Sequence, residues 1–538
     1  MRVFCLGVLL FFELGAVASG RLAAQERAAQ GRGEWKLEVR QQEPDLPLVS
    51  RVQILSASGQ PQRIRGALFQ QGWNLLDQPR TYLGRVGDYT FQVFHGPEFA
   101  PASGGFTLDL QSTAHDLIRL PRHADLALEG WLGGDLLSQL AVEATRPWMP
   151  AESLAVAVAP QQIVLQANPA ATSPAAASPS QAAAPASLPP PAAAGSVPEP
   201  LQAAAAAWSY SGSSWDARPG SGLVLHHWWP PAAVPEHLPS SRLLVLAKSA
   251  QRGSDLLPVH AELQRVWARD VPIWLASGRI DSVQLLGPHV TIDGLRAEAV
   301  QPLVEPEPGR FRGPHRSGRL VEWLYWQMLE CGLRLPPTAG SGFGSCNSPL
   351  GYNRVYAYAP QPTLPAWWQA VRDGQSFVTN GPLLRATVNG HVPGAVLAAE
   401  QGQTLQLDVA LTLTVADPVE YLEVVFNGQA LYRARLDEYA RAGGAIPPLT
   451  VSSSGWLVVR VVTDREHTFR MATTAPYYVE IGGQRRVSRQ AVAYFQAWLE
   501  RAAEELAASS AETRQAAEPY VAAARQFWQT LADQATDP

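Results

Sequence analysis

Lysine is almost missing from this chain of 538 residues, which has only Lys36 and Lys248 among 42 basic residues. We attribute the arginine bias to base composition rather than to function. The formal net charge of −5 is small for this length, and no run of basic residues occurs. Because clustered positive charge supplies most of the affinity for nucleic acid, we expect no nucleic-acid partner.

Common catalytic signatures are also missing. The eleven histidines never fall in His-x-His or His-Glu-x-x-His spacing, and there is no Gly-x-Ser-x-Gly, P-loop or dinucleotide fingerprint. The three cysteines form no Cys-x-x-Cys pair, so a zinc ribbon is not indicated. No later segment has about 18 uninterrupted apolar residues, so we expect no transmembrane anchor.

The N-terminus, "MRVFCLGVLLFFELGAVASGRLAAQ", has one arginine, a short apolar run and then small residues. This pattern predicts a secretory signal peptide over 1–25 and a protein exported to the periplasm or the exterior. Cleavage would remove Cys5 and leave Cys331 and Cys346. In an oxidising compartment these form either a disulfide or two separate core thiols.

The patterning predicts a multidomain α/β plus β protein. Residues 26–120 alternate with period two and predict an N-terminal β-sandwich-like domain, and 394–483 predict a second one. Between them, 121–393 alternate strand-like and helix-like runs, which predicts a barrel-like or layered α/β domain. The Ala/Pro/Ser-rich stretch 165–207 predicts a disordered insertion, with an interdomain linker as the alternative. Residues 484–538 predict a C-terminal helix pair.

Several local features follow from the same patterns. Helical spacing predicts a helix over 317–331, and Asn427-Gly428 predicts a hairpin turn. Ser488 is expected to cap the first C-terminal helix, and Pro519 to interrupt the helical pattern before the second.

Metal-type side chains gather in two places. His226-His227 is the first, and because neighbours on a strand face opposite ways, one site rarely uses both. The second is His260, Glu262, Asp270, Asp281 and His289 near predicted strand ends. Imidazoles and carboxylates are ligands of divalent metals, but we favour the simpler interpretation of a solvated helix followed by two core strands.

A resemblance covers about 126–531, interrupted by the insertion. The blocks "CGLRLPPTAGSGFGSCNSPLGYNRVYAYA" and "WWQAVRDGQSFVTNGPLLRATVNGHVPG" resemble the bacterial PHP-superfamily metallohydrolases of the CehA/McbA type. The resemblance implies a distorted α/β barrel that holds divalent metals at its strand ends and hydrolyses phosphoester or related bonds.

This chain differs from that family in the metal-ligand motif. A Gly-Asp-Leu-His-x-His motif corresponds to Gly134 onward, where Asp135 is retained but Leu137 and Gln139 replace the histidines. Gly342 stands where metal-binding relatives often have an aspartate. Leucine has no lone pair and a glutamine carbonyl is a poor, neutral ligand, so tight metal binding is not expected here.

We therefore expect an exported, non-catalytic protein that keeps this fold for binding or structure and needs no cofactor. One alternative is an active hydrolase with Zn, Mn or Fe on relocated ligands, taken from Asp135, His226, His227, His260, Glu262 and His289. A second alternative is a protein-interaction module. The 17 tryptophans suit either carbohydrate stacking or core packing.

Overall fold

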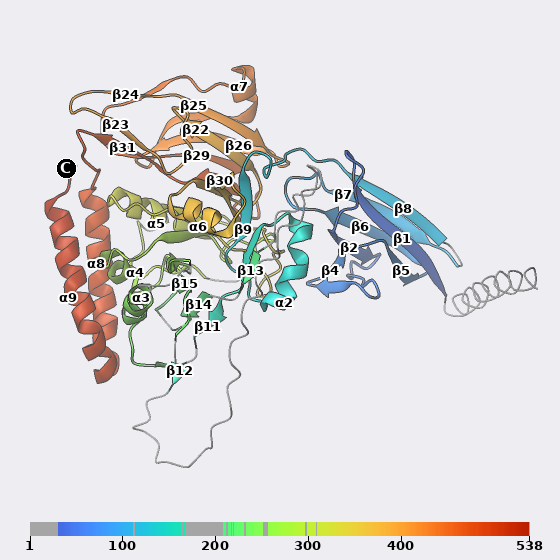
Figure 1. The fold of residues 1–538 in the computed structure, drawn as a ribbon, viewed down its shortest axis with the longest axis horizontal. Helices are drawn as coiled ribbons and strands as arrows, with labels where there is room; N and C mark the ends of the chain where they lie inside the picture. Colours follow the sequence, from blue (N-terminus) through green and yellow to red (C-terminus); the bar gives the residue numbers. More distant parts are fainter. Residues whose placement is uncertain are drawn as a thin grey trace, which may run out of the picture.

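The computed structural model describes residues 31–536, apart from 111–112, 164, 167–207, 211–212, 217, 219, 231–232, 251–256, 296–298 and 308. The predicted signal peptide (1–25) and nearly all of the predicted insertion (165–207) lie outside these residues. Figure 1 shows an α/β body in the middle, N-terminal strands on one side, C-terminal strands above and a long helix pair on the far side. The described chain is mixed α/β plus β, with several sheets and few helices.

The N-terminal strands form two sheets around a shared core. The strands are β1 (Arg32–Gln41), β2 (Ser50–Ser56), β3 (Leu68–Gln70), β4 (Trp73–Leu76), β5 (Arg80–Arg85), β6 (Gly87–Phe94), β7 (Ala102–Leu108) and β8 (Thr113–Leu120). Their orders are β5-β1-β8 and β3-β4-β2-β6-β7. The fully buried Trp35 of β1 stacks on Phe106 of β7, with ring centroids 4.0 Å apart. The two sheets therefore pack face to face.

The α/β body contains short strands that are mostly buried. Its elements are β9 (Trp131–Asp135), α2 (Val142–Thr145), η1 (Arg146–Trp148), η2 (Pro150–Glu152), β10 (Val156–Val158), β11 (Gln161–Gln162), β12 (Leu165–Gln166), β13 (Trp208–Tyr210), β14 (Ser213–Asp216), β15 (Leu223–His226), β16 (Val234–Pro235), α3 (Ser240–Ser249), β17 (His260–Leu263), α4 (Val271–Ala276), β18 (Ser282–Leu286), α5 (Arg316–Glu330), β19 (Pro337–Ala339), β20 (Arg354–Tyr358), α6 (Leu364–Arg372) and β21 (Ser376–Thr379). The helix α5 confirms the helix predicted over 317–331.

The strands of this body divide between two sheets. In one, β9 and β13 pair with β10 in parallel; in the other, β17, β18 and β19 are parallel, with β14 and β15 antiparallel beside them. β19 lies beside β20 and β21 of the first sheet, and both sheets contribute to one core. Hydrogen bonds do not close a barrel among the described strands.

Six of the ten C-terminal strands continue the first of these sheets, and the other four form two separate two-stranded sheets. The ten strands are β22 (Leu383–Val388), β23 (Val396–Ala399), β24 (Leu405–Leu407), β25 (Val409–Thr414), β26 (Val419–Phe426), β27 (Gln429–Ala434), β28 (Leu449–Val451), β29 (Gly455–Thr463), β30 (Met471–Thr474) and β31 (Tyr477–Ile481), with α7 (Leu436–Arg441). The order β9-β20-β21-β30-β29-β26-β27 runs from the α/β body into this region. The predicted boundary at 393/394 is therefore crossed by a continuous hydrogen-bonded sheet.

Local sequence signals are confirmed in this half of the chain, with one exception. Asn427 and Gly428 have φ of 49° and 74° between β26 and β27, the left-handed geometry of a tight hairpin turn. Ser488 accepts a hydrogen bond from the Ala491 N–H and caps α8 (Arg489–Ala507). The interruption expected at Pro519 is wrong, because Pro519 lies inside the continuous helix α9 (Ala511–Asp533).

Tertiary packing explains why the proline is tolerated. α9 lies along α4 and α8, and its Val521 and Trp528 belong to the core of the α/β body. The Trp528 indole N–H donates to the Pro272 carbonyl at 3.0 Å. This burial offsets the backbone hydrogen bond that Pro519 cannot make.

Two polar networks attach the N-terminal domain to the α/β body. In the first, Arg51 of β2 donates to Glu152 at 2.5 Å, and its guanidinium carbon lies 4.3 Å from the ring centroid of Trp73. Arg354 of β20 lies 3.7 Å from the same carboxylate and donates to the Glu152 carbonyl at 2.8 Å. All three charged side chains are buried, so two guanidinium groups share one carboxylate as their counter-charge away from water.

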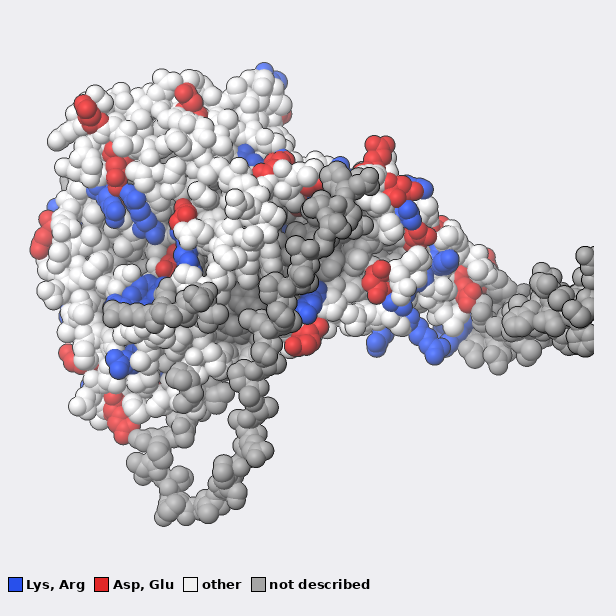
Figure 2. All heavy atoms as spheres, viewed as in Figure 1, with Lys and Arg blue, Asp and Glu red and all other residues white. Residues whose placement is uncertain are grey.

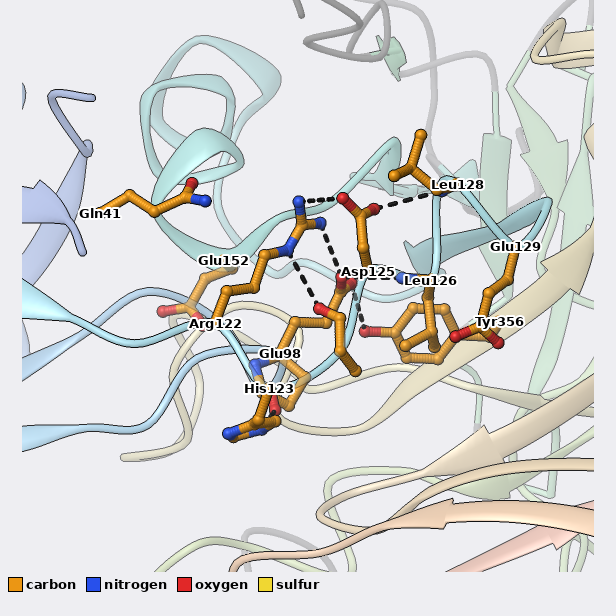
Figure 3. A network of polar contacts seen from close by, with 12 residues as sticks. Gln41, Glu98, Arg122, His123, Asp125, Leu126, Leu128, Glu129, Glu152 and Tyr356 are labelled. Atoms are coloured by element: carbon orange, nitrogen blue, oxygen red, sulfur yellow. Dashed lines mark hydrogen bonds and ion pairs between the residues drawn. The ribbon is translucent and has the colours of Figure 1, made fainter. Parts of the chain in front are cut away.

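The second network is drawn in Figure 3. Arg122 donates to Glu98 at 3.0 Å and to Asp125. Glu98 also accepts from the Leu126 N–H at 3.1 Å and from the Tyr356 hydroxyl at 3.3 Å. Because Tyr356 belongs to β20, the segment that leaves the N-terminal domain is fastened to the central sheet.

Removing the charge of Glu152 should destabilise the protein strongly. Glu152→Gln leaves two buried guanidinium groups without a counter-charge, which typically costs about 3–5 kcal/mol. Urea denaturation measures the change in free energy of unfolding. The control is Asp45→Asn, which removes the exposed partner of Arg40 and should have a far smaller effect. An equal effect of both variants would contradict this account of the interface.

Candidate functional site

Asp135, which the resemblance aligns with a metal-ligand motif, accepts hydrogen bonds from the backbone of two other loops. Its Oδ1 accepts from the N–H groups of Leu137 at 3.0 Å and Ser341 at 2.9 Å. Its Oδ2 accepts from the Gly351 N–H at 2.7 Å and from the Ser341 hydroxyl. The side chain is fully buried, and burial raises the pKa of its carboxyl while these hydrogen bonds oppose the rise. Asp135 therefore holds the end of β9 against the loops at 341 and 351.

Two of the positions that the resemblance aligns with metal ligands, Leu137 and Gly342, offer no side-chain ligand atom. Leu137 is 1% exposed. A Cβ added at Gly340 would lie 2.4 Å from the Cβ of Leu137, so the loop that contains Gly340 packs directly against this apolar side chain. Gly342 has φ of +68°, and a Cβ there would lie 2.6 Å from Pro288 Cγ. An aspartate at 342 would therefore need both a left-handed backbone and a shift of Pro288. Gln139 is half-buried and lines a cavity.

His226, His260 and Glu262 come together, as the relocated-ligand alternative requires. His226 of β15 pairs directly with His260 of β17, and Glu262 follows on the same face. His226 Nε2 lies 3.6 Å from Glu262 Oε2, and His226 Nδ1 hydrogen-bonds with Ser213 Oγ at 3.0 Å. His260 Nε2 hydrogen-bonds with Ser282 Oγ at 2.7 Å.

Glu262 is already occupied by protein donors. It accepts from the Gln284 amide and from the Thr338 hydroxyl, each at 2.8 Å. His226, His260 and Glu262 have no exposed surface. They belong to a buried polar network inside the core in which Glu262 has its donors, whereas His226 Nε2 and His260 Nδ1 have no hydrogen-bond partner among the described residues.

Trp368 of α6 closes this network from solvent. Its ring centroid lies 5.0 Å from that of His226, 5.0 Å from that of His260 and 4.7 Å from that of His227. Burial lowers the pKa of His260 well below its ordinary value, so its imidazole is neutral at pH 7. Ser213, His226 and Glu262 follow one another like a nucleophile relay, but a substrate cannot reach the fully buried Ser213.

The remaining predicted residues lie outside the network. His227 leaves the strand with φ of 61° and hydrogen-bonds with the Pro258 carbonyl at 2.9 Å. His289 packs edge-on to Trp267, with ring centroids 5.4 Å apart. Asp270 pairs with Arg269 at 2.7 Å, and Asp281 pairs with Lys248.

Cys331 and Cys346 are free thiols, so they do not form the disulfide that we considered. Cys331 is buried at the end of α5. The Cys346 thiol instead donates to the Ser341 carbonyl at 3.3 Å, beside the loop that Asp135 holds.

A cavity does persist at the carboxyl ends of β9 and β10, where the resemblance predicts the active site. It has a volume of about 410 Å³ and is lined by Gln139, Glu143, Gln161, Gln162 and Trp215 among others. Except for Gln139, these residues were missed by sequence reasoning, because they match no ligand motif. The only available signal was that they follow or neighbour predicted buried strands.

The family resemblance is supported only by the sequence blocks quoted above, because comparisons with known proteins add no match. A scan against protein-family models finds no match to the chain, and neither does a search of curated proteins or of solved structures. Over the residues that the structure describes, no group of three or more His, Cys, Asp or Glu has a metal-binding arrangement. No helix in that part of the chain is long and apolar enough to cross a membrane.

Asp135→Asn should destabilise the protein whether or not metal is present. The amide would turn an N–H₂ group toward buried donors that have lost their acceptor, which we expect to cost about 3 kcal/mol. Chemical denaturation with and without a chelator measures the effect. Asp88→Asn, on the exposed surface beside Thr107, is the matched control. A loss that appears only in metal-loaded protein would instead identify Asp135 as a ligand.

Acid should weaken the fold through His289. Burial lowers the pKa of His289 to about 4, whereas an unfolded histidine titrates near pH 6.5. Below pH 6.5 the unfolded chain therefore binds a proton that the folded protein excludes, so stability falls as pH falls towards 4. His289→Gln should remove about 2 kcal/mol of the loss between pH 7 and pH 5. The comparison is with the exposed His391→Gln, and identical slopes for both variants would contradict the prediction.

Proposed function

We propose that this protein is an exported, non-catalytic binding protein built on a scaffold like that of the PHP metallohydrolases of the CehA/McbA type. The resemblance of the 331–358 and 374–394 blocks supports the scaffold. So do the parallel strands β9 and β10 and the shared core of the two α/β sheets. In this proposal the two sheets correspond to a distorted barrel that has opened.

The observation that carries the proposal is the state of Asp135. Metal-assisted hydrolysis needs ligands that are free to hold a cation and an open position for water. Asp135 instead accepts four hydrogen bonds from the protein, and Leu137 is part of the core. A metal at this place would need at least two new ligands and the release of three backbone N–H groups.

The alternative of relocated ligands has less support. His226, His260 and Glu262 are close together, but all three are buried beneath Trp368 and Glu262 is satisfied by Gln284 and Thr338. Hydrolysis there would require substrate and water to enter the packed core. We therefore favour binding over catalysis.

Surface charge fits a role that does not depend on electrostatic attraction. Figure 2 shows few charged side chains over the α/β body and C-terminal sheets, and a mixture of both signs over the N-terminal domain. Recognition at a cavity whose described lining has no basic side chain is then the simplest form of binding.

Elemental analysis tests the proposal. The purified protein is incubated with Zn, Mn or Fe, desalted and assayed for metal and for hydrolysis of bis(p-nitrophenyl) phosphate. We expect less than about a tenth of an equivalent of metal and no hydrolysis above the buffer rate. The proposal is overturned by about one equivalent of metal that Glu262→Gln or His260→Gln abolishes and His391→Gln leaves unchanged.

A further inference from the structure

The cavity at the ends of β9 and β10 includes Gln139, a position that the resemblance aligns with a metal ligand. Gln139 comes from the loop after β9, Glu143 from α2, Gln161 and Gln162 from β11 after β10, and Trp215 from β14. Its volume of about 410 Å³ lies within the range of roughly 300–1,000 Å³ typical of small-molecule pockets. The space has room for a compact ligand and is open to solvent at the exposed side chains of Glu143, Gln161 and Gln162.

Three amide groups line this space without protein partners. The side chains of Gln139, Gln161 and Gln162 make no hydrogen bond to another residue in the described part of the chain. Each amide offers two donors and an acceptor with two lone pairs. A pair of neighbouring hydroxyls, where each group both donates and accepts, is the complementary ligand surface.

The charge of the lining excludes anionic ligands. Glu143 is the one charged side chain among the described lining residues, and no Lys or Arg accompanies it. Phosphates and carboxylates are normally held by charge-assisted hydrogen bonds from basic groups. A carboxylate such as Glu143 is an acceptor only and binds hydroxyl donors instead.

Trp215 supplies an aromatic surface beside the amides. It is half-buried and in register with Gln162, its neighbour across the β11–β14 pair. The Arg265 guanidinium lies 5.5 Å from the centroid of its ring, which holds the indole in place. A rigid indole next to hydrogen-bonding groups suits a ligand with one apolar face and a polar edge.

We propose that this cavity binds a neutral saccharide, with the glutamine amides and Glu143 on its hydroxyls and Trp215 against the C–H face of a sugar ring. The inference deepens the proposed binding function and rests on it. It identifies the ligand class as uncharged and polyhydroxylated.

Titration of the full protein with cellobiose, maltose and N,N′-diacetylchitobiose, followed by calorimetry and tryptophan fluorescence, tests this inference. At least one of these sugars should bind, and Gln139→Ala, Gln162→Ala and Trp215→Ala should each weaken it about tenfold, the effect of losing roughly 1.4 kcal/mol of contact. Trp229→Ala and Gln429→Ala, which change an exposed tryptophan and an exposed glutamine far from the cavity, should leave it unchanged.

Melting temperatures separate loss of binding from loss of fold. Trp215→Ala removes a strand side chain, so the glutamine variants decide the outcome if it unfolds. The inference is overturned if none of the three sugars binds, if the cavity variants bind as tightly as the controls, or if a sugar phosphate binds more tightly than the free sugar. If no sugar binds and the protein also retains no metal, only the ligand class is overturned. If the protein retains stoichiometric metal and hydrolyses the phosphodiester, the proposed function itself is overturned.

Discussion

The arrangement of the strand-end loops depends on one buried carboxylate. Asp135 accepts hydrogen bonds from three backbone N–H groups and one hydroxyl, and so joins the end of β9 to the loops at 341 and 351. The loop at 340–342 lies directly against Leu137, whose carbonyl accepts from the Gly342 N–H at 2.8 Å. An ionised carboxylate that is taken out of water is stable only when its lone pairs are occupied. The same bonds occupy the lone pairs that Asp135 would offer to a metal.

The polar cluster below Trp368 shows how metal-type residues can serve a core. His226 and His260 face each other across neighbouring strands, and each hydrogen-bonds to a buried serine. Glu262 binds Gln284 and Thr338, which come from β18 and β19. Hydrogen bonds of this kind select one register among five adjacent strands, from β14 to β19, because a shift by one residue would bury more unpaired polar groups. Proximity of histidine and glutamate is thus explained by strand pairing.

Local signals in the chain were sufficient for features that neighbouring residues decide. The Asn427-Gly428 turn, the Ser488 cap and the helix α5 depend on short-range hydrogen bonding and on side-chain periodicity, and all three were predictable. Pro519 was misleading because packing of α9 against α4 and α8 outweighs one missing backbone hydrogen bond. The shared sheet across 393/394 was also hidden, since pairing between β21 and β30 joins strands far apart in the sequence.

The sequence by itself determined that Leu137 and Gln139 stand where the resemblance would place histidine ligands, because side-chain chemistry is readable without a fold. It also determined the alternation that separates the β regions from the α/β region. Only the tertiary structure decided that Asp135 is a backbone acceptor, that the histidine cluster is closed by Trp368, and that Gln139 lines a cavity with Trp215. The physical reason is that burial and hydrogen-bond partners come from residues distant in the chain, so the role of a polar side chain depends on what the fold places around it.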